Sequence, residues 1–198
     1  MLFRSPNEDG VEYFCSAIWP LIRERRPQAI FRIVGRNPSP RVQRLAEVPG
    51  VEVSGTVPDV RPMLAAASVV VVPLRVGGGT RIKIFEALAM EKGVVSTSLG
   101  AEGLPVESGV NIELADAPRH FADAVVELLE DEQRRRRLGE AGRELVEARF
   151  STESVARQFE AICQSAIANG KNGRAFRDGR PTGARRDDSS IVRRSAAP

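Results

Sequence analysis

The sequence predicts an α/β domain built on a parallel β-sheet with helices on both faces. Short apolar runs alternate with longer amphipathic segments along most of the 198 residues. Strands are expected at residues 30–34, 51–54, 69–74, 94–97 and 111–114. Helices are expected at residues 10–25, 40–47, 60–66, 80–90, 118–129, 132–148 and 152–168. Strands that alternate with helices of this length are joined by right-handed crossovers, which make the sheet parallel and gather binding loops at its carboxyl edge.

Composition divides the chain into a body, residues 1–168, and a tail, residues 169–198, that we expect to be disordered because it has few apolar residues. The tail holds eight basic and three acidic residues, which leaves 21 basic against 23 acidic residues in the body. Since the body has no basic excess, we expect no nucleic-acid partner. The charge of the tail could bring the protein to an anionic membrane surface, although a solvated tail is the simpler interpretation.

The remaining composition excludes several classes of site. Cys15 and Cys163 both fall in helical segments, so neither a disulfide framework nor a metal site is expected. No apolar run approaches about 18 residues, and the amino terminus lacks the pattern of a signal peptide. A cytoplasmic location is the simplest interpretation, with peripheral contact at the inner face of the membrane as an open alternative. The single histidine, His120, is expected on a helix surface, and no catalytic constellation is identified.

Residues 73–90 carry the most specific functional signal in the chain. An apolar run ends at Pro73, and three glycines then lead into a helix expected from Thr80. The glycines are Gly77, Gly78 and Gly79. Glycine lets the backbone approach a ligand closely. A helix start offers unpaired N–H groups and a positive dipole end, so this segment favours a phosphate ligand.

Charged residues in the same helix refine the ligand. Arg81 and Lys83 strengthen the anion site. Glu86 would be repelled by phosphate, and it fits only where the ligand donates hydrogen bonds, as ribose hydroxyls do. The combination predicts a nucleoside diphosphate that carries a sugar.

Other nucleotide-binding motifs fit this segment poorly. A Walker A loop needs a Gly-Lys pair, which is absent here, and a dinucleotide fingerprint would need glycine where Ile82 stands. On spacing alone, a flexible turn capped by Thr80 with solvated cations also stays open.

Five segments, in this order, carry a resemblance to a known family: residues 6–11, 30–35, 51–59, 73–90 and 94–103. They resemble the C-terminal, donor-binding half of retaining glycosyltransferases of the GT-B fold, family 4 (glycosyltransferase group 1). The resemblance implies a Rossmann-like domain and the transfer of a sugar from a nucleotide-sugar donor to an acceptor hydroxyl. It implies no cofactor and no metal.

The resemblance also implies roles for the residues of the glycine segment. The backbone N–H groups of Gly78, Gly79 and Thr80 would receive the diphosphate, with Arg81 and Lys83 as supporting cations. The family's usual diphosphate cations lie elsewhere, so these two are additions of this chain.

Two further roles and one departure follow from the same resemblance. Glu86 matches the second glutamate of the family's paired-glutamate motif, which holds the ribose hydroxyls, and Val57 would lie against the base. The first glutamate, which contacts the donor sugar, would stand at position 78, where this chain has Gly78. The resemblance therefore assigns no residue of this chain to the contact with the donor sugar.

Other departures concern length and a helix end. The family's enzymes have two facing domains, whereas this chain matches one, from just after its first strand. We therefore expect a sheet without a central strand, and a glycosyltransferase fragment. The alternatives are a non-catalytic nucleotide-sugar-binding module that needs a separate acceptor-binding domain or chain, and an inactive remnant. Because Glu91 stands where the family has glycine, the left-handed helix cap is expected at Gly93.

Overall fold

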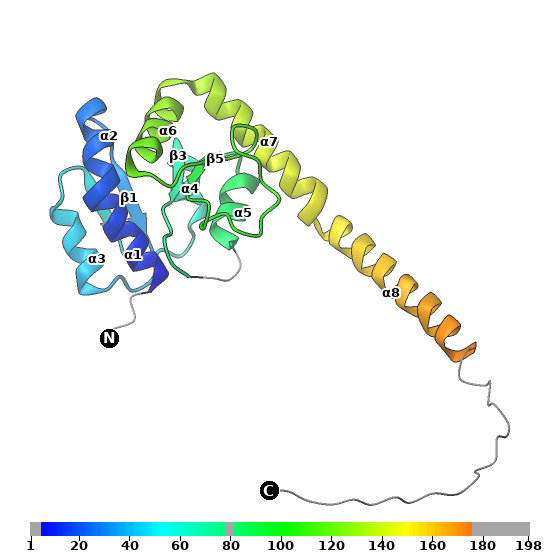
Figure 1. Ribbon diagram of the computed structural model, residues 1–198. Helices are drawn as coiled ribbons and strands as arrows, with labels where there is room; N and C mark the ends of the chain where they lie inside the picture. The colour runs from blue at the N-terminus through cyan, green and yellow to red at the C-terminus, as the bar shows by residue number, and fades with distance from the viewer. Residues whose placement is uncertain (1–4, 78–80, 176–198) are drawn as a thin grey trace, which may run out of the picture. The chain divides into compact units, whose positions relative to one another are not determined.

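The computed structural model describes residues 5–77 and 81–175, with side chains described as far as Asn169. Within these residues the predicted α/β fold is confirmed (Figure 1). The strands are β1 (Phe31–Val34), β2 (Val51–Ser54), β3 (Val69–Val72), β4 (Gly93–Ser96) and β5 (Glu113–Leu114). Each lies within or beside the apolar run that predicted it.

All strand pairing among the described residues is parallel, but it forms two sheets instead of the predicted one. β1 pairs with β2, with Phe31 opposite Val51. β3, β4 and β5 form the second sheet in that order, with Val69 opposite Gly93 and Val95 opposite Glu113. The division arises because no described strand pairs with both β1 and β3.

The first predicted helix begins earlier than expected and contains an irregular turn. It consists of α1 (Pro6–Tyr13), a π-helical turn (Phe14–Ile18) and α2 (Trp19–Arg25). The Ser5 side chain caps α1 by accepting a hydrogen bond from Glu8 N at 3.3 Å, and a proline follows at the first helical position. The π-helical turn ends just before Pro20, which cannot donate to the carbonyl four residues earlier.

The other helices match their predictions closely, except at the carboxyl end. They are α3 (Pro40–Arg44, extended by a 3₁₀ turn at Leu45–Glu47), α4 (Arg61–Ala66), α5 (Ile82–Ala89), α6 (Pro118–Glu130), α7 (Glu132–Phe150) and α8 (Thr152–Ala175). Residues 169–175 continue α8 instead of joining the tail, since no proline stops the helix there. The remainder of the tail, residues 176–198, lies outside the described residues. The chain divides into two compact units after Ser154.

Helices cover both faces of the three-stranded sheet, as predicted. Val94 and Val95 are adjacent in β4, so their side chains point to opposite faces. Val95 belongs to a core cluster with Phe121 of α6, whereas Val94 belongs to a second cluster with Ile84 and Leu88 of α5. All five side chains are completely buried, and each large one stabilises the fold by about 1.5–3 kcal/mol.

The predicted left-handed cap at Gly93 is wrong. Glu91 itself has φ 56°, and Gly93 begins β4. Glu91 N donates to Leu88 O at 2.9 Å and Lys92 N to Ala87 O at 3.0 Å, which is the Schellman pattern of a helix end. The hydrogen bonds of the motif hold a glutamate in the conformation that usually selects glycine.

Candidate functional site

The segment that ends at Gly77 packs against the first turn of α1. Gly77 has φ 104°, and a Cβ added to it would lie 2.6 Å from Pro6 Cγ. Gly10 also lies close to the residues after β3, since its added Cβ would meet Pro73 O at 3.2 Å. Glycine is required at position 77 for both its conformation and this close approach.

A partly buried ion pair joins the same two elements. Asp9, in the first turn of α1, accepts hydrogen bonds from Arg75 Nε at 3.2 Å and from Arg75 Nη2 at 2.8 Å. The Arg75 guanidinium carbon also lies 4.2 Å from the centre of the Tyr13 ring. Bidentate pairing holds the loop after β3 in a defined orientation.

Lys83 makes a third contact with α1, from the other side of the loop. Its Nζ donates to Asn7 Oδ1 at 2.8 Å. Desolvation lowers the pKa of Lys83, and the negative charge of Glu86 opposes that shift. Glu86 is exposed on α5, so the two predicted residues share the open face of that helix.

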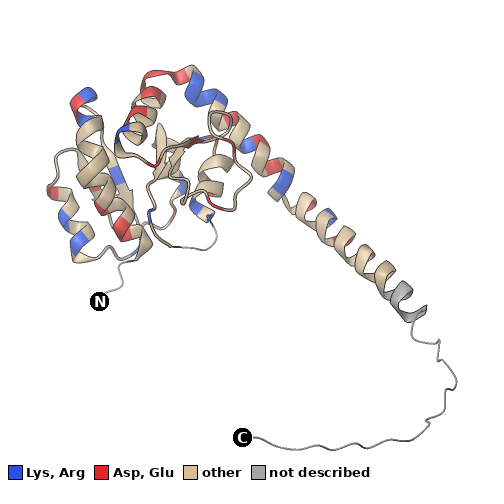
Figure 2. Cartoon of the chain, viewed as in Figure 1, with Lys and Arg blue, Asp and Glu red and all other residues tan. Residues whose placement is uncertain are grey.

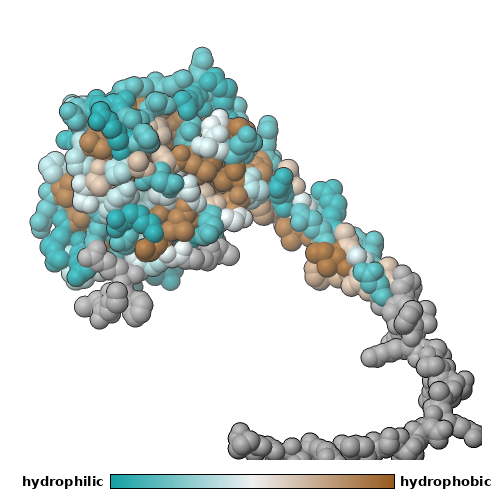
Figure 3. All heavy atoms as spheres, in the orientation of Figure 1, coloured by the Kyte–Doolittle hydropathy of each residue, from teal (hydrophilic) through white to brown (hydrophobic). Residues whose placement is uncertain are grey.

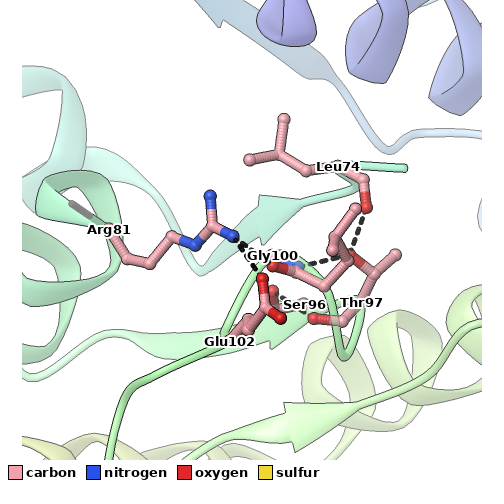
Figure 4. Close-up of polar contacts among 7 residues, drawn as sticks. Leu74, Arg81, Ser96, Thr97, Gly100 and Glu102 are labelled. Atoms are coloured by element: carbon pink, nitrogen blue, oxygen red, sulfur yellow. Dashed lines mark hydrogen bonds and ion pairs between the residues drawn. The ribbon is translucent and has the colours of Figure 1, made fainter. Parts of the chain in front are cut away.

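Arg81 points into the protein instead of sharing that open face (Figure 4). It is the N-cap residue of α5, and only 7% of its side chain is exposed. Nη2 donates to Leu99 O at 2.7 Å and lies 3.4 Å from Glu102 Oε2. Nε has no hydrogen-bond partner in the part of the chain that the structure describes.

The turn that receives Arg81 is fixed against the ends of two strands (Figure 4). The Thr97 hydroxyl donates to Leu74 O and accepts from Gly100 N at 2.9 Å. Ser96 Oγ donates to Thr97 O at 2.9 Å. A Cβ added to Gly100 would lie 2.4 Å from Ser96 Oγ and 2.9 Å from Val72 O, so the turn needs glycine there. The turn therefore lies at the carboxyl ends of β3 and β4, where parallel sheets bind ligands.

The remaining predicted site residues are Val57 and three residues of the glycine segment. Val57 lies half-buried in the loop between β2 and α4, also beyond the carboxyl end of its strand. Gly78, Gly79 and Thr80 lie outside the described residues. Thus Gly77 and Lys83 meet at α1, Arg81 faces the turn after β4, and the assignments of the site residues remain predictions.

Sequence reasoning missed four residues that organise this region: Asn7, Asp9, Arg75 and Glu102. An acid in a first helical turn such as Asp9 is ordinarily explained by the helix dipole, so it gave no signal of its partner. Arg75 could have been noticed, because a cation between a buried strand and a glycine run is unusual for a flexible loop.

The charge distribution, the possible metal ligands and the single histidine also bear on the predictions. Acidic and basic residues are interspersed along the helices and loops (Figure 2). No group of three or more His, Cys, Asp or Glu residues is placed to hold a metal ion within the described ranges. His120 is exposed on α6, as predicted.

Comparison with known proteins identifies the family. The fold is that of α/β proteins with parallel sheets, which bind ligands at the carboxyl ends of their strands. Residues 2–131 match the family model described as glycosyl transferases group 1. The chain belongs to this family.

Individual relatives agree with the family model. The chain is 31% identical over 96 residues to N-acetyl-alpha-D-glucosaminyl L-malate synthase of Bacillus anthracis. The aligned stretch covers 46% of this chain and 24% of the relative. The chain therefore spans about a quarter of the length of that relative.

Solved glycosyltransferase structures share the fold. One is a mutant of TarM from S. aureus in complex with Fondaparinux, alpha-GlcNAc-glycerol and UDP, with TM-score 0.69 and 18% identity over 80% of this chain and 33% of that one. Another is the C-terminal domain of a group 1 family glycosyl transferase (LpcC) from Francisella tularensis, with TM-score 0.62 and 19% identity over 76% and 83% of the two chains.

Proposed function

We propose that this chain binds the nucleotide-sugar donor of a glycosyltransferase and takes part in transferring the sugar to an acceptor hydroxyl. The observation that carries the proposal is the attachment of the glycine segment to α1 on both sides, through Arg75 and Lys83. The residues on either side of Gly78, Gly79 and Thr80 are held in this way, which lowers the ordering entropy that donor binding would cost there.

The proposed chemistry needs only charge stabilisation from this domain. The bond between the anomeric carbon and the diphosphate oxygen breaks, and the diphosphate leaves with the electron pair. The acceptor oxygen forms the new bond, and its proton passes to an oxygen of the departing diphosphate. The amino end of α5 and Lys83 would stabilise the charge that develops on the diphosphate, with no metal. Retention of the anomeric configuration is part of the proposal.

Glu86 is proposed to hold the ribose hydroxyls. Its exposure on α5 leaves both carboxylate oxygens open to a ligand, and its charge favours hydroxyl donors over phosphate. Val57 is proposed to lie against the base. A uracil base is the first to test, because UDP is bound in the TarM structure that shares this fold.

A separate acceptor-binding domain or chain is proposed to complete the enzyme. The chain corresponds to a third of TarM and about a quarter of the curated relative. A strand outside this sequence is further proposed to lie between β1 and β3 and to join the two sheets, since strands without partners leave unpaired backbone groups.

Peripheral membrane contact at the inner face is a weaker proposal, favoured by one observation on α8. Figure 3 shows apolar side chains along this helix, and Val155, Phe159, Ile162 and Ile167 are each at least half exposed. A basic tail follows them in sequence. No helix among the described residues is long and apolar enough to cross a membrane. Sedimentation with anionic vesicles should fall when Phe159 and Ile162 are changed to serine, and unchanged sedimentation would remove this proposal.

Calorimetric titration tests the donor site. UDP, GDP and ADP and their glucose conjugates are titrated into the full chain and into Glu86→Gln. We expect saturable binding of one nucleotide, weakened about tenfold or more by the substitution. Glu144→Gln on the exposed face of α7 makes the same charge change and should leave binding unaltered.

The outcomes separate the two main functions. Donor binding with slow donor hydrolysis or sugar transfer favours an enzyme. Donor binding without any turnover, even when an acceptor domain is supplied, favours the non-catalytic binding module. A folded chain that binds none of the nucleotides contradicts the proposal.

A further inference from the structure

We propose that Glu102 is the residue that binds the hydroxyl groups of the donor sugar. The inference rests on the proposed donor site and adds to it a carboxylate from a second loop. It concerns the sugar end of the donor. The acid of α5, Glu86, is assigned to the ribose at the other end.

The backbone of Glu102 is held in a fixed place at the proposed site. Its own N–H donates to Leu99 O at 3.3 Å, and Leu104 N donates to Ala101 O at 3.1 Å, so the turn is closed by successive hydrogen bonds. Thr97 ties the start of the turn to Leu74 O, at the end of β3. A carboxylate on such a turn is positioned at the carboxyl edge of the sheet without relying on a flexible loop.

The side chain of Glu102 combines exposure with a buried counter-charge. Its side chain is 67% exposed, while that of the neighbouring Arg81 is only 7% exposed. Arg81 Nη2 lies 3.4 Å from Glu102 Oε2, and no hydrogen bond of Oε1 is found among the described residues. A carboxylate is an acceptor only, so an exposed and oriented one is matched to hydroxyl donors.

The contacts of Arg81 with the described residues leave one of its donors unpaired. Its Nε is buried and unpaired within the described residues, which ordinarily costs about 1–3 kcal/mol. A contact at 3.4 Å with a mostly exposed carboxylate offsets little of that cost. The Glu102 carboxylate therefore stays available, beside Arg81, to a ligand that reaches it from solvent (Figure 4).

The two acids then serve opposite ends of one donor. Arg81 caps the start of α5 and points inward, and Glu86 lies five residues later on the open face, about 7.5 Å further along the axis. A diphosphate at the helix start separates the ribose from the sugar. The nucleoside therefore lies towards Glu86 and the sugar towards Glu102.

Paired titrations distinguish this role from a purely structural one. UDP and UDP-glucose, or the diphosphate and glucose conjugate of whichever base the chain prefers, are titrated into wild type, Glu102→Gln and Glu102→Ala. We expect the affinity for the diphosphate to stay within about twofold, and the affinity for the sugar conjugate to fall about tenfold or more. Glu107→Gln, an exposed acid five residues further on, is the matched control and should change neither affinity.

Each other outcome overturns the inference. An equal loss for both ligands would mean that Glu102 acts only by neutralising Arg81 or through the fold. No loss for either ligand would mean that the carboxylate faces solvent in the complex. Thermal unfolding of each variant checks the fold, and Glu102→Gln keeps the size of the side chain if Glu102→Ala unfolds. If wild type binds neither ligand, the proposed donor site itself fails, which is a different result from an unaltered variant.

Discussion

Asp9 and Arg75 stand 66 residues apart in the sequence and form two parallel hydrogen bonds, at 2.8 and 3.2 Å. The Asp9 side chain is 12% exposed, whereas that of Arg75 is 46% exposed. The buried member comes from a helix and the exposed member from a loop. The loop before Gly77 is therefore positioned by α1. The geometry of the proposed donor site thus depends on an ion pair that would not itself contact the donor.

The first prediction concerns Asp9→Asn. Loss of the charge leaves one acceptor for two guanidinium donors, and we expect the free energy of unfolding to fall by about 1–2 kcal/mol, because Arg75 remains half in solvent. Urea unfolding followed by circular dichroism measures the change.

A matched control separates this pair from an ordinary surface pair. Asp123 pairs with Arg25 at 2.6 Å, but both side chains are more than 40% exposed. Asp123→Asn should therefore cost less than about 1 kcal/mol. Equal losses for the two variants would show that Asp9 is no more than a surface partner.

Strand positions could be predicted from the sequence because each strand lies in or beside a local apolar or alternating pattern. The run at residues 51–54 became β2 with the predicted bounds, and Val69–Val72 lies inside the predicted 69–74. β3 is four consecutive valines, whereas β2 alternates apolar and polar residues, and both patterns are visible in the sequence. Pairing between distant strands leaves no such local mark, so the division into two sheets could not be predicted from these runs.

The directions of the side chains in the candidate site could not be predicted from the sequence either. Arg81 and Lys83 both follow the glycines and were expected to act alike as cations for a phosphate. The structure directs Arg81 to the carbonyl of Leu99, 18 residues further on, and Lys83 to Asn7, 76 residues earlier. No spacing rule links residues at these separations, and only the folded chain relates them.

The second prediction is that Glu91→Gly stabilises the protein. A left-handed conformation costs a residue with a Cβ roughly 1 kcal/mol relative to glycine, and Glu91 adopts φ 56° at the end of α5. We expect a gain of about 0.5–1 kcal/mol, measured by thermal or urea unfolding. Glu91→Ala is the control, because it also removes the exposed contact with Arg143 but keeps the Cβ, and should give no gain. A similar gain for both variants would assign the effect to charge instead of backbone conformation.

The third prediction is that Gly139→Ala destabilises the protein, although alanine is ordinarily the better residue within a helix by about 1 kcal/mol. A Cβ at Gly139 in α7 would lie 2.2 Å from the backbone oxygen of Glu91. Because backbone must move, we expect a loss of about 2 kcal/mol or more. Gly142→Ala mainly meets the end of the flexible Leu88 side chain, at 2.6 Å, and should lose less. Stabilisation by Gly139→Ala would contradict the close packing of α7 on the end of α5.

The fourth prediction distinguishes the two cysteines. Burial raises the pKa of the Cys15 thiol to about 11, and only 5% of the residue is exposed. Cys163 is a half-exposed thiol on α8. Because the thiolate is the reactive form, N-ethylmaleimide at pH 8 should modify Cys15 at least about a hundredfold more slowly than Cys163, as measured by peptide mass spectrometry.

The same pKa shift gives the pH dependence of stability a definite sign. Since the folded-state pKa of Cys15 is raised, the native state binds the proton more tightly than the unfolded state between pH 9 and 11. The contribution of Cys15 to stability is complete below pH 9 and is lost as the pH rises through this window. In concentrated urea both cysteines should react at similar rates, which serves as the control. Equal labelling of Cys15 and Cys163 in the native protein would contradict the burial of the π-helical turn that carries Cys15.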